Sequence, residues 1–185
     1  MLIAVSEAVR GEMSAMGIGS ASRWRVIRNG ISPIFRSESL PSPAQRNKAQ
    51  LLAVGSLTEE KGYDVVLRAL PTIASSHPGV ELVFVGDGPL KASLQALAND
   101  LNVASRVRFI GVVADVRPWL RQSTLLVAPS LSEGLGMAVV EAMAMECPVV
   151  ASRVGGLVEV VIHGETGFLV QAGRVPLLAQ QVVEL

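Results

Sequence analysis

Short apolar runs alternate along this chain with longer segments in which apolar residues recur on one side of a helix. The runs are rich in Val, Leu and Ile, as expected for strands that are buried on both faces of a sheet. They occupy residues 2–5, 25–28, 51–54, 81–85, 107–110, 124–128, 149–152 and 168–170. Amphipathic helices are predicted at residues 6–16, 63–76, 90–101, 136–146, 157–162 and 175–185, with a short helix after Asp115. Strands that alternate with helices in this way predict an α/β fold with a Rossmann-like, doubly wound parallel sheet.

The ends of the predicted helices are marked by cap residues and by proline. Ser6 is a predicted N-cap, and Asp115 is expected to cap the short helix that follows it. Pro148 should separate the helix 136–146 from the next strand. Pro71 lies within the helix 63–76 and is expected to kink or split it, because proline has no N–H to donate.

Residues 37–49 differ in composition from the rest of the chain. They are rich in Ser, Pro and charged residues, which is typical of a loop or linker. We therefore expect an N-terminal segment and linker over residues 1–49 and one regular domain over residues 50–185.

Composition and charge exclude several classes of function. Half of the residues are hydrophobic and 17% are charged, which suits buried strands covered by helices. Sixteen basic and sixteen acidic residues give a formal net charge of zero, so neither nucleic acid nor an anionic membrane is an expected partner. Cys147 is the only cysteine, and His77 and His163 stand apart in the sequence, so no metal site is expected. No apolar run reaches membrane-helix length and residues 1–5 lack the basic start of a signal peptide, which predicts a cytoplasmic protein.

Glycine-containing loops follow most of the predicted strands. Gly55, Gly86, Gly111 and Gly155 each come at or shortly after the carboxyl end of a strand, and Gly134 and Gly136 lie in the loop after the strand 124–128. Ligands bind parallel sheets at this edge. The helix that starts near Gly136 offers unpaired N–H groups to an anion such as phosphate.

Two carboxylates bracket that helix start. Glu133 precedes it, and Glu141 lies inside it between apolar neighbours. A carboxylate next to phosphate repels it, so sugar hydroxyls are the expected partners of both. The alternative is a solvated loop and helix with no ligand.

Two common nucleotide motifs are incomplete. Gly86-Asp-Gly88 begins like a dinucleotide fingerprint, but Lys91 stands at the third glycine position and the motif follows the wrong strand for a dehydrogenase. Lys61-Gly62 is not followed by the Ser or Thr of a phosphate-binding P-loop. A lysine at the start of a helix can still reach a diphosphate as a point charge, the alternative being a solvated side chain.

The stretch from residue 129 to residue 156 resembles the E-x7-E signature of the GT-B-fold, retaining glycosyltransferases of the group 1, or family 4, type. The resemblance is carried by Pro-Ser at 129–130, Glu-Gly at 133–134, Glu-Ala-Met-Ala at 141–144, Pro-Val-Val-Ala-Ser at 148–152 and Gly-Gly at 155–156. The loop at 55–62 is similar to the G-R-x4-K-G loop of the family. Its lysine is Lys61, but Ser56 stands where the family has arginine.

The resemblance implies a role for each candidate residue. Glu133 and Lys61 would be the catalytic pair, with Glu133 on the donor sugar and Lys61 on the diphosphate. Glu141 would bind the ribose. The remaining nucleotide-binding positions would be Gly134, Gly136, Met137, Gly86, Gly111 and Val112.

By the same resemblance, the chain is the donor-binding half of a hexosyltransferase. Its donor would be a UDP- or GDP-linked sugar, with no cofactor or metal, and its acceptor would be a hydroxyl group. Residues 1–49 would include the crossover from an N-terminal domain that this chain lacks, so the chain alone should not transfer sugar. Peripheral membrane association of the full enzyme is compatible with this reading. The alternatives are a stand-alone, degenerate nucleotide-sugar-binding module, which Ser56 favours, and a GT-B-type nucleotide-sugar epimerase.

Overall fold

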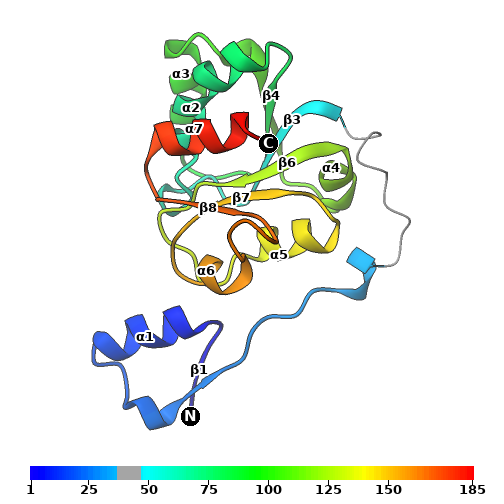
Figure 1. Ribbon diagram of the computed structural model, residues 1–185. Helices are drawn as coiled ribbons and strands as arrows, with labels where there is room; N and C mark the ends of the chain where they lie inside the picture. Colours follow the sequence, from blue (N-terminus) through cyan, green and yellow to red (C-terminus); the bar gives the residue numbers. More distant parts are fainter. Residues whose placement is uncertain (37–46) are drawn as a thin grey trace.

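A computed structural model describes residues 1–36 and 47–185 of the chain, which form a six-stranded parallel sheet with helices on both faces and a small N-terminal unit beneath it (Figure 1). The strands of the sheet are β3 (Asn47–Val54), β4 (Glu81–Val85), β5 (Val107–Gly111), β6 (Ser123–Ala128), β7 (Val149–Ser152) and β8 (Phe168–Val170). Their order is β5-β4-β3-β6-β7-β8, and every neighbouring pair is parallel. The predicted α/β class and parallel sheet are therefore confirmed.

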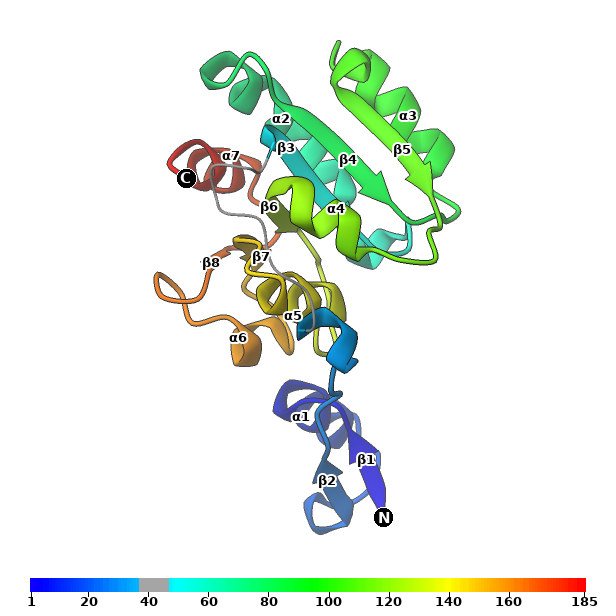
Figure 2. The same cartoon turned by 90° about the vertical axis from the view of Figure 1, so that its right-hand side faces the viewer.

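Two apolar cores lie on the two faces of this sheet. Leu51 and Ala53 of β3 belong to one core, while Leu52, between them, belongs to the other, as the two-residue period of a strand requires. The first core is covered by α2 (Tyr63–Ser76), α3 (Lys91–Asp100) and α7 (Val175–Val183). The second is covered by α4 (Arg117–Gln122), α5 (Met137–Ala144) and α6 (Leu157–Val160). Figure 2 shows α2 and α7 on one side of the sheet and α5 and α6 on the other.

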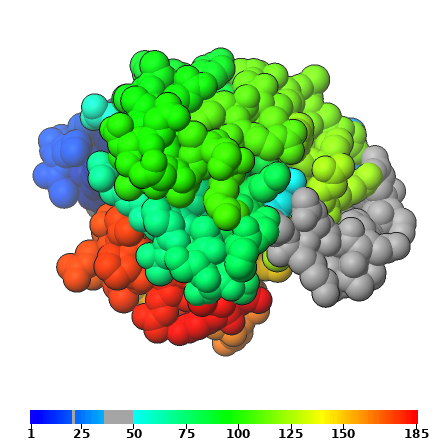
Figure 3. Space-filling view, turned by 90° about the horizontal axis from the view of Figure 1, so that it is seen from above, coloured from blue at the N-terminus to red at the C-terminus, as the bar shows by residue number. Residues whose placement is uncertain are grey.

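The C-terminal helix α7 returns to pack against α2, far from it in the sequence. Leu178 and Val182 of α7 are buried in the same core as Leu67 and Leu70 of α2. In the view from above, the red residues of α7 adjoin the blue-green residues of α2 (Figure 3). The first and last helices of the main domain therefore share one core.

Pro71 does not divide α2, so the prediction of a split helix is wrong. Leu70 and Ile73, on either side of the proline, are fully buried and hold both parts of the helix on the sheet. This packing outweighs the hydrogen bond that proline cannot make.

Two other boundaries differ from the predicted ones. β3 begins at Asn47, which pairs with Ser123 of β6, so regular structure begins before the boundary predicted at Gln50. Of the predicted linker 37–49, residues 37–46 lie outside the described residues. Helix α5 ends at Ala144, and Glu146 adopts a positive φ of 53° in the turn that leads to Pro148.

The N-terminal unit consists of β1 (Leu2–Ala4), α1 (Glu7–Ala15) and β2 (Trp24–Val26), with the two strands parallel. Ser6 caps α1, as predicted, since its Oγ accepts from the N–H of Val9 at 3.1 Å. The N-cap of α4 is Val116, one residue after the predicted Asp115, although Asp115 Oδ1 still accepts from the N–H of Arg117 at 3.0 Å.

The carboxylate of Glu159 bonds the N-terminal unit to the main domain. Glu159, in α6, accepts from the backbone N–H of Ala8 through Oε1 at 2.9 Å. Its Oε2 accepts from Nη2 of Arg28 at 2.7 Å. One side chain therefore holds both the start of α1 and the segment after β2.

Candidate functional site

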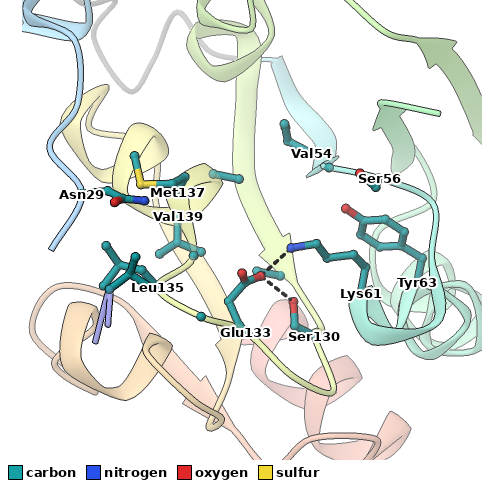
Figure 4. A pocket seen from close by; sticks show the side chains of 16 residues that line it. Asn29, Val54, Ser56, Lys61, Tyr63, Ser130, Glu133, Leu135, Met137 and Val139 are labelled. Carbon is teal, nitrogen blue, oxygen red and sulfur yellow. Dashed lines mark hydrogen bonds and ion pairs between the residues drawn. The ribbon is translucent and has the colours of Figure 1, made fainter. Parts of the chain in front are cut away.

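A pocket of about 410 Å³ lies at the carboxyl ends of β3 and β6, between the loops that follow them (Figure 4). It is lined by Val5, Asn29, Val54, Gly55, Ser56, Lys61, Tyr63, Ala128, Ser130, Glu133, Gly134, Leu135, Gly136, Met137, Ala138 and Val139. The predicted positions Lys61, Glu133, Gly134, Gly136 and Met137 are thus brought together. This is the edge of the sheet at which the sequence placed a ligand.

Lys61 and Glu133 form an ion pair inside the pocket. Nζ of Lys61 lies 2.6 Å from Oε2 of Glu133, and Ser130 Oγ donates to the same oxygen at 3.4 Å. The side chains are 23% and 16% exposed, so the pair is largely shielded from solvent while still facing the pocket. Figure 4 shows both side chains directed toward each other from opposite loops.

The loop that carries Lys61 is fixed to the loop that carries Glu133 by backbone contacts. The carbonyl oxygen of Glu60 accepts from the N–H groups of Leu131 at 2.7 Å and Ser132 at 3.3 Å. Gly62, with φ +60°, lies so close to Pro129 that an added Cβ would be 2.3 Å from the Pro129 carbonyl oxygen. The distance between the two charged groups is therefore set by the scaffold.

Gly155 and Gly156 hold the Glu133 loop from its other side. An added Cβ at Gly155 would lie 2.0 Å from the Glu133 carbonyl oxygen, and one at Gly156 would lie 2.2 Å from the Gly134 carbonyl oxygen. The N–H of Gly156 also donates to the Glu133 carbonyl at 3.0 Å. The glycine pair allows two loops to pack backbone to backbone, and in this way it positions Glu133.

Helix α5 begins at the wall of the pocket. Its N-cap is Gly136, with φ +88°, which has no side chain to satisfy the first N–H groups of the helix. An added Cβ there would lie 2.4 Å from Leu157, so only glycine fits. The open helix start near Met137 therefore faces the pocket with the positive end of its dipole.

Glu141 lies further along α5 and does not line this pocket. Its carboxyl is partly buried, and burial raises the pKa of Glu141 above its ordinary value. The described part of the chain provides no hydrogen bond or ion pair to this side chain. An acid that is partly desolvated and unpaired gains most from a ligand that donates hydrogen bonds to it.

Gly86, Gly111 and Val112 lie along the neighbouring part of the same sheet edge, beside the pocket and not in its wall. The N–H of Gly86 donates to the Gly111 carbonyl at 2.8 Å, and a Cβ at Gly86 would be 2.0 Å from the Gly55 carbonyl oxygen. Val112 is 81% exposed. An apolar residue exposed at the end of a strand can provide a surface for a flat ring.

Ser56 lines the pocket at the position where an arginine would otherwise stand. Among the described residues that form the wall, Lys61 is the one cationic side chain. Its charge is matched by that of Glu133, so the wall carries little net charge.

Val5, Asn29 and Tyr63 are among the lining residues that the sequence analysis did not mark as site residues. Val5 and Asn29 belong to the N-terminal segment, and their place depends on the docking of that segment through Glu159. Val5 Cγ2 would lie 3.4 Å from an added Cβ at Gly134. Tyr63, the first residue of α2, contributes its side chain from the opposite wall. The sequence analysis used Tyr63 only as the first residue of the predicted helix 63–76.

Over residues 1–36 and 47–185, no three His, Cys, Asp or Glu side chains gather in a way that could hold a metal ion. Within the same ranges, no helix has both the length and the apolarity needed to cross a membrane.

The chain is similar in sequence to a known protein family and to individual members of it. Residues 48–185 match the family described as "Glycosyl transferases group 1". An uncharacterized glycosyltransferase of Methanocaldococcus jannaschii is 32% identical over 181 residues, which cover 91% of this chain and 46% of that protein. The glycogen synthase of Mycobacterium tuberculosis H37Rv is 34% identical over 171 residues, which cover 90% of this chain and 40% of the synthase.

A solved structure shows the same fold at higher coverage. The structure of Anabaena HepE in complex with UDP and glucose superposes with a TM-score of 0.89 at 29% identity, covering 100% of this chain and 53% of HepE. The chain therefore spans about half of HepE, and less than half of each of the two curated relatives above.

Proposed function

The chain belongs to the group 1 glycosyl transferases, and we propose that it forms the donor-binding half of a retaining enzyme that transfers a hexosyl group from a nucleotide-diphosphate sugar to an acceptor hydroxyl. The observation that carries this proposal is the Lys61–Glu133 pair, held at 2.6 Å in a pocket that the uncapped start of α5 also faces. A cation and a helix start suit a diphosphate, and the carboxylate suits sugar hydroxyls.

In this proposal, each group meets a different part of the donor. Lys61 and the backbone N–H groups near Gly136 and Met137 hold the diphosphate, next to Gly134. Glu133 accepts hydrogen bonds from the hydroxyls of the donor sugar. The proposal extends the donor along α5 to Glu141, whose carboxylate accepts from the ribose hydroxyls.

The base would lie at the neighbouring part of the sheet edge. Gly86 and Gly111 are bonded to each other there, and Val112 offers an exposed apolar side chain. UDP in the complex of the similar Anabaena protein supports a UDP-linked donor, with GDP as the alternative.

In the reaction, the bond between the anomeric carbon and the diphosphate breaks, and a bond to the acceptor oxygen forms with the same anomeric configuration. The proton of the acceptor hydroxyl passes to the leaving diphosphate. Negative charge grows on the leaving diphosphate as the bond breaks. Lys61 and the dipole of α5 stabilise that charge, so the proposal requires neither a metal ion nor another cofactor.

The acceptor site belongs to a second domain in this proposal. The chain spans less than half of its curated relatives above, and the N-terminal unit beside the pocket is the part that would meet such a domain. The isolated chain would therefore bind the donor without transferring sugar. We propose a cytoplasmic location for the full enzyme, which is compatible with peripheral association with a membrane.

Ser56 favours a second candidate, a nucleotide-sugar-binding module without transferase activity. With the Lys61 charge matched by Glu133, the wall has no further cation for the growing charge of a leaving group. The two candidates share the same ligand and differ in turnover.

Calorimetric titration of the chain with UDP, GDP and ADP, and with the glucose- or mannose-linked form of each, tests the shared part. One diphosphate should bind more tightly than the other two, and its sugar form should bind more tightly still. Lys61→Met should weaken both about tenfold, because a charge-assisted contact is lost. Absence of binding by all six compounds at millimolar concentration would refute both candidates.

A further inference from the structure

The diphosphate part of the pocket lacks the positive charge that its ligand calls for. Lys61 is already paired with Glu133, and a serine occupies position 56. A diphosphate needs several hydrogen-bond donors as well as charge, because its oxygens lose their hydration on binding. A neutral donor that faces this part of the wall would supply one of these hydrogen bonds.

The hydroxyl of Tyr63 is such a donor. The Tyr63 side chain is 4% exposed, and its hydroxyl points from the α2 wall toward the pocket, beside Ser56 (Figure 4). No residue in the described part of the chain forms a hydrogen bond with it. The ring is buried and the hydroxyl faces the pocket, so a ligand in the pocket can accept a hydrogen bond from it.

The ring of Tyr63 is held in place by aromatic contacts. It meets the ring of Phe84 edge to face, with the centroids 5.2 Å apart and an interplanar angle of 68°. Phe84 is itself fully buried and stacks on Phe109 at 4.9 Å. The hydroxyl is therefore fixed in position before a ligand arrives, and a bond to it costs little side-chain entropy.

Gly55 keeps the hydroxyl uncovered and next to Lys61. A Cβ added at Gly55 would lie 2.9 Å from Oη of Tyr63 and 3.6 Å from Cε of Lys61. The tyrosine hydroxyl and the lysine side chain thus both border the pocket space next to Gly55. A ligand atom in that space would meet a neutral donor and a cation together, which suits a phosphate oxygen and suits an apolar or cationic group poorly.

The local electrostatics keep this hydroxyl protonated. Burial and then the nearby charge of Glu133 raise the pKa of Tyr63 well above its ordinary value. The group therefore acts as a donor throughout the physiological pH range.

We propose that the Tyr63 hydroxyl donates a hydrogen bond to the diphosphate of the nucleotide, next to Lys61 and in the part of the wall where Ser56 leaves no cation. This inference rests on the proposed function and adds to it a binding residue outside the Glu133–Glu141 stretch. It makes the first residue of α2 part of the phosphate site.

Tyr63→Phe tests the inference because it removes one oxygen and keeps the ring and its contacts with Phe84. The tightest binder among UDP, GDP and ADP and its parent nucleoside are titrated into both chains by calorimetry. The variant should bind the diphosphate about tenfold more weakly and the nucleoside equally well, since a bond to a charged acceptor is lost. Ser75→Ala is the matched control: it removes a hydroxyl near the other end of α2, which is bonded to the Pro71 carbonyl, and should change neither affinity.

Each other outcome overturns the inference. Equal diphosphate affinity in Tyr63→Phe and the original chain would show that the hydroxyl makes no contact, and equal losses for diphosphate and nucleoside would show that the contact is not to phosphate. Absence of nucleotide binding by the unchanged chain would refute the proposed function and this inference with it.

A second measurement applies if Tyr63→Phe does not fold. Tyr63 is the only tyrosine of the chain, so ¹³C labelling of the tyrosine Cζ gives one NMR signal. That signal should move when the diphosphate is added and stay in place when the nucleoside is added. If the chemical shift of this signal does not change when the diphosphate is added, the inference is refuted without any substitution.

Discussion

Glu133→Gln should make the chain bind a bare nucleoside diphosphate more tightly. In the pocket the Lys61 charge is held by Glu133 at 2.6 Å, so a diphosphate must compete with a carboxylate for it. Glutamine keeps the size of the side chain and its reach toward Ser130, but removes the negative charge. Lys61 then becomes free to meet phosphate, and the repulsion between carboxylate and phosphate disappears.

The size of the gain follows from the geometry of the pair. Two unit charges 2.6 Å apart attract each other by about 2–6 kcal/mol as the effective dielectric constant falls from about 80 to about 20. Most of this is offset by the hydration that both groups lose, and pairs that keep some exposure contribute about 1 kcal/mol net. At 23% and 16% exposure, we expect about fivefold tighter diphosphate binding.

The assay is calorimetric titration of the original chain and the variant with a nucleoside diphosphate and with its sugar-linked form. The variant should gain affinity for the diphosphate, and the gain should shrink at high salt, because the pair remains partly exposed. It should also lose the extra affinity of the sugar form, since Glu133 is assigned to the sugar. Glu60→Gln, on the same loop as Lys61 but outside the pocket wall, should change neither value.

An unchanged or weaker affinity of Glu133→Gln for the diphosphate would refute this reasoning. It would mean that Lys61 is available to phosphate while still paired, so that the ion pair serves to orient the lysine and does not compete with the ligand.

Three further substitutions have clear expected results. Glu141→Gln should bind the diphosphate about tenfold more weakly in calorimetry. It should also melt at a higher temperature at neutral pH. Burial raises the pKa of the Glu141 carboxyl, so the original chain loses stability as the pH rises from the ordinary carboxyl pKa through the raised one. Below both pKa values, the difference in melting temperature between the two chains should vanish. Gly156→Ala places a Cβ 2.2 Å from a backbone oxygen and should lower the free energy of unfolding by about 1–3 kcal/mol in urea, whereas Gly11→Ala, in open space on α1, should not. Glu159→Gln should speed hydrogen exchange at the Ala8 amide, since a neutral acceptor holds it less firmly; an unchanged exchange rate would show that the carboxylate does not hold the N-terminal unit.

The helices and strands could be predicted where the apolar pattern agrees with the residues that end an element. The strands at 81–85 and 149–152 and the helix at 63–76 have the predicted bounds, because each is apolar in a consistent pattern and ends at glycine, proline or polar residues. Predictions failed where tertiary packing overrides a local rule. Pro71 is tolerated inside α2 for this reason, and β3 extends back to Asn47 because β6 offers it a partner.

The site was predictable as an edge of the sheet and not as a set of contacts. The rule that carboxyl ends of parallel strands share an edge placed Lys61 near Glu133, although 72 positions separate them. It could not show that the two would be bonded to each other. Tyr63 escaped notice because a buried aromatic residue in an apolar helix gives no sign of where its hydroxyl points. Val5 and Asn29 escaped because their position depends on contacts with distant parts of the chain, among them those of Glu159 and Gly134.

The packing of α7 against α2 has a consequence for how the chain is made. The nascent chain emerges from the ribosome with its N-terminus first, so α2 leaves the exit tunnel long before Leu178 and Val182 of α7. These two residues cover α2 in the finished core. Until then, the apolar side of α2 has no partner from α7 and is open to chaperones or to other nascent chains. Slow translation between α2 and α7 would lengthen that exposure, so the yield of folded protein should depend on synonymous codon choice in this part of the gene.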